Sequence, residues 1–252
     1  MRVDLLCSGS KGNCCIIRHK DTQLMIDCGS TKKYLTQAFM QAGVKKKDLD
    51  AVLITHTHKD HVAQLKHFRD LPIYSYCDLE DCSQHRIVRP LSQFDVKDLH
   101  IRVIGLSHDA PKTVGYVLET SEEKLVYITD TGYIPNHEKK YMENADYYIF
   151  ESNHDVATLM KTRRPMFVKQ RILGDSGHLN NEDASSCLTG LINTNTKKIV
   201  LAHLSEEANN PEMALDVLQN TFLKRDLPYT GIDWEAAGQH TITSLGMDLY
   251  NE

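Results

Sequence analysis

A histidine-rich run, Thr55-His56-Thr57-His58-Lys59-Asp60-His61, has the clearest capacity for chemistry in this sequence. The apolar stretch Ala51–Ile54 precedes it and predicts a strand, so the run begins where a strand ends. Alternate side chains of extended backbone share a face, so the first two histidines can point to one side. Asp60 and His61, at the start of the next predicted helix, can face a second point nearby. Imidazole and carboxylate together suit Zn²⁺, Mn²⁺ or Fe²⁺, so the run predicts a metal site rather than a solvated loop.

Four neighbouring residues cannot fill the coordination spheres of two metal ions, and three further candidates follow later strands. These candidates are His108, Asp130 and His203. Each comes directly after, or within two residues of, one of the apolar stretches Ile101–Leu106, Lys124–Thr129 and Lys198–Ala202. A strand end is a rigid platform that holds a ligand with little positional slack. We therefore expect all three to join the histidine run.

The elements that must position these residues alternate along the chain. Predicted strands are Val3–Cys7, Asn13–Arg18, Gln23–Asp27, Ala51–Ile54, Ile101–Leu106, Val114–Glu119, Lys124–Thr129, Tyr147–Glu151 and Lys198–Ala202. Predicted helices are Lys32–Ala42, Asp60–Phe68, Asn153–Lys161, Asn181–Leu191 and Pro211–Leu223. Strands that are paired early and alternate with helices later predict a sheet-centred α/β protein. The sequence has no visible internal repeat or low-complexity segment.

Composition limits the possible partners and the compartment. The 252 residues carry a net charge of -5, so nucleic-acid binding would need a local basic patch. The N-terminus, Met1-Arg2-Val3-Asp4, lacks the apolar region of a secretory signal, and no stretch approaches the ~20 apolar residues of a membrane helix. The seven cysteines are odd in number and form no C-x-x-C pair, which favours a reduced cytoplasmic protein over a disulfide framework.

The pattern H-x-H-x-D-H, followed by a later His, Asp and His, resembles the metallo-β-lactamase superfamily. The resemblance implies a four-layer αββα sandwich, here a single domain over residues 1–252, with two divalent metal ions at one edge. It implies that His56, His58 and His108 hold one ion, that Asp60, His61 and His203 hold the other, and that Asp130 bridges them. Gln64 stands where the superfamily often has a glycine, but it is not among the ligands.

Further motifs narrow the resemblance to the YycJ/WalJ family, which is similar to tRNase Z in motif order. The motifs are Ser8-Gly9-Ser10-Lys11-Gly12-Asn13, the histidine run, His108-Asp109-Ala110, Val114-Gly115-Tyr116, Thr129-Asp130-Thr131-Gly132, Glu151-Ser152-Asn153-His154-Asp155 and Gly177-His178-Leu179. The likeness runs almost from end to end, although Asn180 replaces a serine that usually follows the last motif. It implies a 5′→3′ DNA exonuclease.

Two divalent cations that share a water lower its pKa toward about 7 and so supply hydroxide at neutral pH. They also neutralise charge on a phosphoryl group in the transition state. Asp60 and Asp130 can orient the nucleophile while acting as ligands. By resemblance to the Gly-His motif of tRNase Z, His178 is the candidate general acid, unless it is an ordinary loop histidine beside a helix N-cap. His154 could donate the proton instead, or fix a metal-bound imidazole.

Two segments are candidates for substrate contact. One is a basic cluster before His178, made of Lys161, Arg163, Arg164, Lys169 and Arg171. These side chains are either a solvated helix end or contacts to a phosphate backbone. The other is the Ser8–Asn13 turn, which is either a tight hairpin or an anion-binding loop whose Ser10 and Asn13 line the cleft.

Three functions remain open, and the resemblance to the YycJ/WalJ family supplies the preference for DNA in the first and the signalling system in the third. A nuclease, with DNA more expected than RNA, uses the basic cluster. A small-molecule hydrolase, such as a cyclic phosphodiesterase, lactonase or thioesterase, has no use for it. A non-catalytic accessory protein of a cell-wall two-component signalling system has no need of an intact set of seven ligands.

Overall fold

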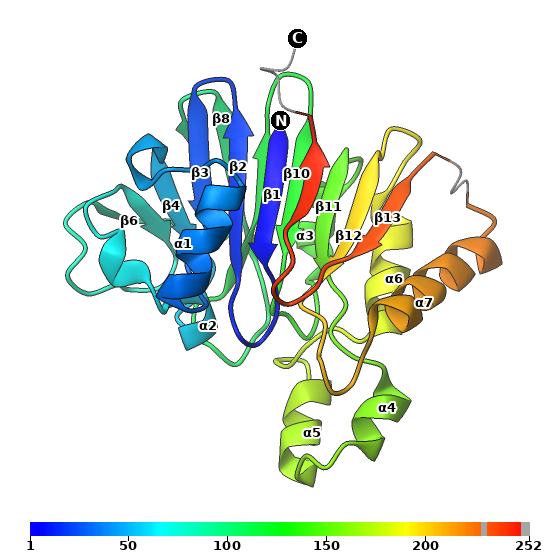
Figure 1. The fold of residues 1–252 in the computed structure, drawn as a ribbon. Coiled ribbons are helices and arrows are strands. Elements are labelled where there is room, and N and C mark those ends of the chain that lie inside the picture. The colour runs from blue at the N-terminus through cyan, green and yellow to red at the C-terminus, as the bar shows by residue number, and fades with distance from the viewer. Residues whose placement is uncertain (228–230, 248–252) are drawn as a thin grey trace.

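The computed structural model describes residues 1–227 and 231–247, which fold around two seven-stranded sheets (Figure 1). The first sheet contains β1 (Arg2–Cys7), β2 (Cys14–His19), β3 (Thr22–Ile26), β4 (Ala51–Ile54), β5 (Ile73–Ser75), β6 (His85–Ile87) and β14 (Thr243–Gly246). The second contains β7 (Gln93–Val96), β8 (Leu99–Gly105), β9 (Val114–Glu119), β10 (Lys124–Ile128), β11 (Tyr147–Glu151), β12 (Lys198–Ala202) and β13 (Asp233–Ala236). The helices are α1 (Lys32–Gln41), α2 (Lys59–Val62), α3 (Asn136–Met142), α4 (Val156–Lys161), α5 (Met166–Leu173), α6 (Asn181–Leu191) and α7 (Pro211–Lys224).

The two sheets repeat one pairing pattern. The first sheet runs β14-β1-β2-β3-β4-β5-β6 and the second runs β7-β8-β9-β10-β11-β12-β13. In each of these orders the first three pairings are antiparallel and the last three are parallel. This symmetry leaves no repeat in the sequence. Its consequence is that each sheet gathers the carboxyl ends of several parallel strands at one edge, where ligand sites commonly lie.

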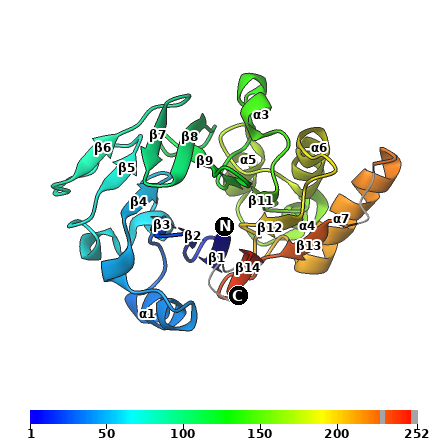
Figure 2. The same cartoon turned by 90° about the horizontal axis from the view of Figure 1, so that it is seen from above.

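Side chains that alternate along the strands build three layers of core. In β4, Ala51 and Leu53 pack between the sheets, whereas Val52 and Ile54 pack beneath α1. In β12, Val200 faces the other sheet and Leu201 faces the layer of α6 and α7. Because both faces of these strands are buried, the strands read as unbroken apolar runs. Figure 2 shows the helices outside the two sheets, which confirms the predicted αββα sandwich.

Every predicted strand is present, with boundaries shifted by two residues at most, but two predicted helices differ. The expected helix Asp60–Phe68 is a short α2 followed by a 3₁₀ turn at Leu65–His67. The Asp60 carbonyl accepts from Asn13 N, and Gln64 N donates to the Cys28 carbonyl, so tertiary bonds replace the helical one. The expected helix from Asn153 begins instead at Val156, because Asp155 caps α4 by accepting from Thr158 N.

Several short or edge elements were not predicted at all: β5, β6, β7, β13, β14, α3 and α5. Strands of three or four residues carry too little alternation for a period of two to be recognised. Within the described part of the chain, none of the helices is both long and apolar enough to cross a membrane.

Candidate metal centre

The predicted ligands meet at one end of the sandwich, where parallel strands of both sheets finish. The histidine run leaves β4 of the first sheet, while Asp130 follows β10 and His203 follows β12 of the second. His108 lies beyond the end of the antiparallel strand β8. The structure therefore brings together all seven residues from four separate chain segments, in overlapping groups of imidazole and carboxylate atoms within 4.8 Å of one another.

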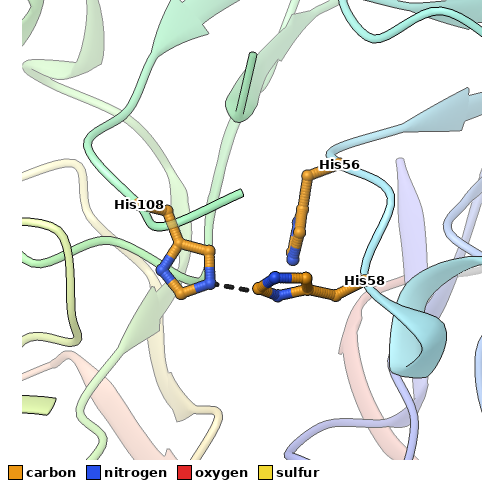
Figure 3. Close-up of side chains that lie close together, drawn as sticks. All are labelled: His56, His58 and His108. Atoms are coloured by element: carbon orange, nitrogen blue, oxygen red, sulfur yellow. Dashed lines mark hydrogen bonds between the residues drawn. The ribbon is translucent and has the colours of Figure 1, made fainter. Parts of the chain in front are cut away.

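Three histidines form the first group (Figure 3). Their ring centroids lie 4.7 Å (His56–His58), 5.0 Å (His58–His108) and 5.2 Å (His56–His108) apart. The Nδ1 of His56 contacts Thr55 Oγ1 at 3.1 Å, and the Nδ1 of His108 donates to the Gly177 carbonyl at 3.0 Å. These contacts leave Nε2 of both rings free for the centre, and His108 Nε2 lies 3.3 Å from His58 Nδ1.

The second group consists of Asp60, His61 and His203. The Nδ1 of His61 is held by Asp27 Oδ2 at 2.7 Å, which turns its Nε2 toward Asp60 Oδ2 at 3.5 Å. The Nδ1 of His203 is held by Glu151 Oε1 at 3.0 Å, so its Nε2 also faces the centre. A carboxylate that fixes one imidazole nitrogen orients the other toward a metal.

Asp130 lies between the two groups. Its Oδ2 is 3.1 Å from His61 Nε2, and its Oδ1 is 3.4 Å from His203 Nε2 and 3.9 Å from His108 Nε2. Oδ2 thus faces His61 of the second group, while Oδ1 lies between His203 of the second group and His108 of the first, so the carboxylate is within reach of both groups.

Buried atoms without hydrogen-bond partners test whether this centre fits metal ions. His56 Nε2, His203 Nε2 and Asp130 Oδ2 are buried and make no hydrogen bond of regular geometry among the described residues. Asp130 shares one group of candidate ligand atoms with His56 and another with His203. Leaving such atoms unsatisfied costs about 1–3 kcal/mol each, so their concentration around Asp130 favours a ligand that binds lone pairs. Imidazole with carboxylate is a donor set for Zn²⁺, Mn²⁺ or Fe²⁺, so the residues fit divalent metal ions.

The charges of the centre are mutually compensated. Burial opposes the ionisation of Asp130, but the fields of His203 and His61 outweigh it and hold the pKa of Asp130 well below its usual range. Burial likewise opposes a charged His203, yet Asp130 and Glu151 raise its pKa to about 9. Burial, followed by the neighbouring His61, lowers the pKa of His56. Because metal ligation needs neutral imidazoles, metal binding displaces protons from the centre.

The backbone conformation also sets the direction of side chains in and beside the centre. Asp27, Asp130 and His203 each follow a strand and have φ of 58°, 59° and 56°. A left-handed backbone at a non-glycine residue costs on the order of 1 kcal/mol and persists where the surroundings fix it. Gly29 permits one close approach, since a Cβ there would lie 1.6 Å from the Asp60 carbonyl oxygen.

Two buried carboxylates in the centre's surroundings were not predicted to take part. Asp27 was placed only as the end of a strand, and Glu151 only as part of a motif. Glu151 Oε1 accepts from both His178 Nδ1 (2.7 Å) and His203 Nδ1 (3.0 Å). The signal available in the sequence was an acidic residue that closes an otherwise apolar, buried strand, Tyr147–Glu151.

The predicted acid, His178, lies beside the centre. Its ring is 5.0 Å from that of His108 and 5.2 Å from that of His203, and its side chain is 16% exposed. Its Nδ1 is committed to Glu151, so Nε2 is the nitrogen available for a proton transfer.

His154 is the predicted catalytic residue with the least contact to the centre. The residue is fully buried, and neither ring nitrogen has a hydrogen-bond partner among the described residues. Burial lowers the pKa of the ring to about 4. In this arrangement neither ring nitrogen contacts a predicted ligand imidazole, so the structure adds no support to either role, and both stay predictions.

The Ser8–Asn13 loop lies against the centre, and its two predicted substrate contacts have different positions. Ser10 is exposed and lines a cavity of about 330 Å³ together with Lys59 and Asp60. Asn13 is fully buried, with its Nδ2 2.9 Å from His61 Nε2 and 3.3 Å from Asp60 Oδ2. Asn13 therefore contacts two predicted ligands rather than the open cavity, and its role as a substrate contact stays a prediction.

The side chains of the basic cluster likewise differ in exposure. Arg163 and Arg171 are exposed, Arg164 donates to Glu207 Oε2 at 3.0 Å, and Arg171 pairs with Asp109. Lys169 is buried, and its Nζ donates to the carbonyls of Met160 (2.7 Å) and Thr162 (2.9 Å). Lys169 thus holds the end of α4, and its role as a substrate contact stays a prediction without support from these contacts.

The chain is similar in sequence to a known superfamily and to two exodeoxyribonucleases. A sequence profile described as a beta-lactamase superfamily domain matches residues 22–204. The exodeoxyribonuclease YycJ of Bacillus anthracis is 36% identical over 227 residues, which cover 85% of this chain and 86% of that protein. The exodeoxyribonuclease WalJ of Streptococcus pneumoniae serotype 2 is 34% identical over 249 residues, which cover 93% of this chain and 92% of that protein.

Solved structures share the fold at lower identity. The metallo-beta-lactamase fold protein YhfI from Bacillus subtilis superposes with a TM-score of 0.70 at 19% identity, covering 97% of this chain and 98% of that chain. The short form of human tRNase Z gives a TM-score of 0.67 at 17% identity, covering 98% and 100% of the two chains.

Proposed function

The chain belongs to the beta-lactamase superfamily and, within it, to the YycJ/WalJ exodeoxyribonuclease family, and from this premise we propose a 5′→3′ DNA exonuclease that uses two divalent metal ions. At the coarser level the chain is a metal-dependent hydrolase. The finer elements of the proposal are the polarity, the preference for DNA, the number of ions and the role of each residue.

The observation that supports this proposal most is the convergence of buried, unpartnered donor atoms from both sheets. Such a centre is too costly to be maintained for packing alone. We assign His56, His58 and His108 to one ion, Asp60, His61 and His203 to the second, and Asp130 to both. When bound, two such ions supply an activated water at neutral pH and neutralise the charge of a phosphoryl group.

The chain's own side chains orient the reaction. Asp60 is the most accessible of the predicted carboxylate ligands, at 23% exposure, and it borders the open cavity. We assign it the orientation of the attacking water, while Asn13 Nδ2 steadies its Oδ2. We assign His178 Nε2 to donate a proton to the leaving oxygen of the cleaved ester. Glu151 compensates the charge of the protonated ring through its bond to Nδ1.

Substrate phosphates would meet the exposed cations beside the centre. Arg171 pairs with Asp109, whose Oδ1 lies 3.5 Å from His58 Nε2. Lys59 lines the open cavity together with Asp60. Phosphate contacts position a nucleic acid without reading its sequence, which suits an enzyme that degrades DNA from an end.

One assay panel tests the proposal. Metal-stripped protein is loaded with Mn²⁺ or Zn²⁺ and offered single- and double-stranded DNA and RNA, labelled at the 5′ or 3′ end, and bis-p-nitrophenyl phosphate. We expect release of 5′-terminal nucleotides from DNA, abolished by a chelator and by His58→Ala. His100→Ala is the matched control, because His100 is a surface histidine that pairs with Asp95 far from the centre.

Other results would replace the proposal. Release of the 3′ label first would reverse the polarity. Faster cleavage of RNA would change the substrate. Hydrolysis of the small diester with no cleavage of any polymer would indicate a small-molecule phosphodiesterase. Elemental analysis of active protein that found no bound metal would remove its basis.

A further inference from the structure

The α4–α5 hairpin projects beyond the strand ends, on the side of the molecule where the metal centre lies (Figure 1). Residues 156–173 contain five cationic side chains and no Asp or Glu, in a chain whose net charge is -5. Lys169 is buried, and Arg164 and Arg171 pair with Glu207 and Asp109, so Lys161 and Arg163 add most to a local positive surface on a negative molecule. Such a surface attracts polyanions and repels a second copy of itself.

The same hairpin exposes apolar side chains that its own core does not need. Phe167 is 72% exposed and Met166 is 55% exposed. The core of the hairpin is complete without them, since Ile172 and Val168 pack on Leu159 and Ala208. An aromatic ring held in solvent beside arginines is the combination that binds unpaired bases and phosphates.

Helical geometry connects this ring to the metal centre. Phe167 and Arg171 are four residues apart on α5, so they share one face and lie about 6 Å apart along the axis. Arg171 pairs with Asp109, and Asp109 Oδ1 lies 3.3 Å from His108 Nε2. The face thus leads from the exposed ring to the predicted metal ligands.

The hairpin is held firmly enough to act as a platform. Lys169 is on the other side of α5, where its Nζ bonds two carbonyls at the end of α4. Beyond α5, the Gly177 carbonyl accepts from His108 Nδ1. The position of α5 is therefore tied both to α4 and to a predicted ligand.

We propose that Phe167, Arg163 and Arg171 form a platform for single-stranded DNA, on which a base stacks on Phe167 while flanking phosphates contact the arginines. This platform rests on the proposed nuclease function and adds its substrate form. Inside a duplex both faces of each base are covered by stacking on its neighbours, so a ring at the surface can stack on a base within the strand only where that base is unpaired. The platform therefore selects a strand that has been separated from its partner near the end being degraded.

Kinetics of Phe167→Ala provide the first test. We compare kcat/KM on a single-stranded oligonucleotide with kcat/KM on bis-p-nitrophenyl phosphate. We expect the ratio of the two to fall about 10-fold, because KM for the oligonucleotide rises. Phe167→Tyr, which keeps a stacking ring, should restore the ratio. Met40→Ala is the matched control, because Met40 is 77% exposed on α1, outside the platform.

Direct binding provides a test that needs no turnover. Phe167→Trp places an indole in the platform, and the parent protein, which has a single tryptophan, supplies the background. In chelator, we expect oligo(dT) to quench the added emission in a saturable way, and Arg163→Gln with Arg171→Gln to weaken the binding at least 5-fold.

The outcomes separate the platform from the activity. If the parent protein cleaves no DNA, the proposed function fails before the platform is reached. If it cleaves DNA while Phe167→Ala keeps its ratio and Phe167→Trp is not quenched, the platform is overturned and the activity stands. Equal losses on blunt duplex and single strand would refute the preference for unpaired bases. A response to anionic vesicles but not to oligo(dT), or a dimer that Phe167→Ala dissociates, would also overturn it.

Discussion

Two buried carboxylates, one associated with each sheet, hold the imidazoles of the centre in different ways. Asp27, after β3, accepts from Thr55 Oγ1 (2.8 Å) and from His61 Nδ1 (2.7 Å) through one oxygen. Glu151, at the end of β11, accepts from His203 and also from His178, which is not a predicted ligand. The first carboxylate therefore serves one predicted ligand, and the second couples a predicted ligand to the predicted acid.

The surroundings of these two groups differ as well. Asp27 lies among fully buried cysteines, and burial raises its pKa even though His61 and Thr55 oppose the shift. Burial acts in the same direction on Glu151, but the charges of His178 and His203 lower its pKa to about 2. Although the sheets share a pairing pattern, the carboxylate of the first contacts a predicted metal ligand, and that of the second also contacts the proposed proton donor. Metal binding and proton transfer should therefore be separable by mutation.

Glu151→Gln should have the largest effect. Glu151 Oε1 receives two imidazole donors and Oε2 receives the Thr131 and Leu179 amides, so an amide NH₂ on either side would face hydrogen-bond donors. We expect DNA cleavage to fall about 10³-fold or more, because both a metal ligand and the acid are misoriented. Raising the Mn²⁺ concentration should not restore it. Steady-state kinetics across a metal titration measure the loss of DNA cleavage. Full rescue by metal would show that Glu151, like Asp27, supports metal binding alone.

His178→Ala should lower DNA cleavage by about 10²–10⁴-fold, the usual contribution of a general acid. Bound metal measured after gel filtration should stay at the parent level, because His178 is outside the predicted ligand set. The decisive comparison is the leaving group. A p-nitrophenolate departs without a proton, so the variant should retain far more activity on the activated diester than on DNA. Proportional losses on both substrates would remove the acid role.

Asp27→Asn should weaken metal binding by about 10–100-fold, as expected for the loss of a partner that orients a ligand histidine. Since Asp27 does not contact His178, DNA cleavage at saturating metal should return to within a few-fold of the parent rate. Competition with a chelator of known affinity gives the dissociation constant of the metal. The rate of DNA cleavage at saturating metal shows whether catalysis itself has changed. A loss of rate that excess metal does not correct would contradict the separation between the two carboxylates.

Residues close together in the sequence were the easiest part of this centre to predict. The offsets within Thr55–His61 are local, so they identified four candidate ligands directly. His108, Asp130 and His203 were found because each follows an apolar strand. The fold class followed from the order of strands and helices together with the family resemblance.

The partners of the ligands could not be found in this way, because they depend on which strands pair. Asp27 reaches His61 only because β3 and β4 are parallel neighbours, and Glu151 lies between Asp130 and His203 only because β11 pairs with β10 and β12. The burial of Lys169 depended on α5, a helix the sequence did not predict. Local patterns thus identified the candidate ligands that the fold brings together, and long-range pairing determined which residues hold them.

The smallest expected effect concerns the metal-free protein. Unfolded histidine titrates near pH 6.5, whereas the pKa of folded His203 is raised to about 9. Between these values the folded state binds more protons than the unfolded state, so stability is full below pH 6.5 and is lost as pH rises toward 9. We expect Tm of chelator-treated protein to fall on the order of 5 °C across this window. Metal-loaded protein should show no such fall, since its imidazoles are neutral ligands and rising pH favours binding.

Glu151→Gln should flatten the dependence of Tm on pH in metal-free protein, because it removes one charge that raises the pKa of His203. Asp27→Asn should leave the contribution of His203 to that dependence unchanged. Calorimetry at several pH values would reveal the difference, and parallel profiles for the two variants would show that the carboxylates are not distinct in this respect.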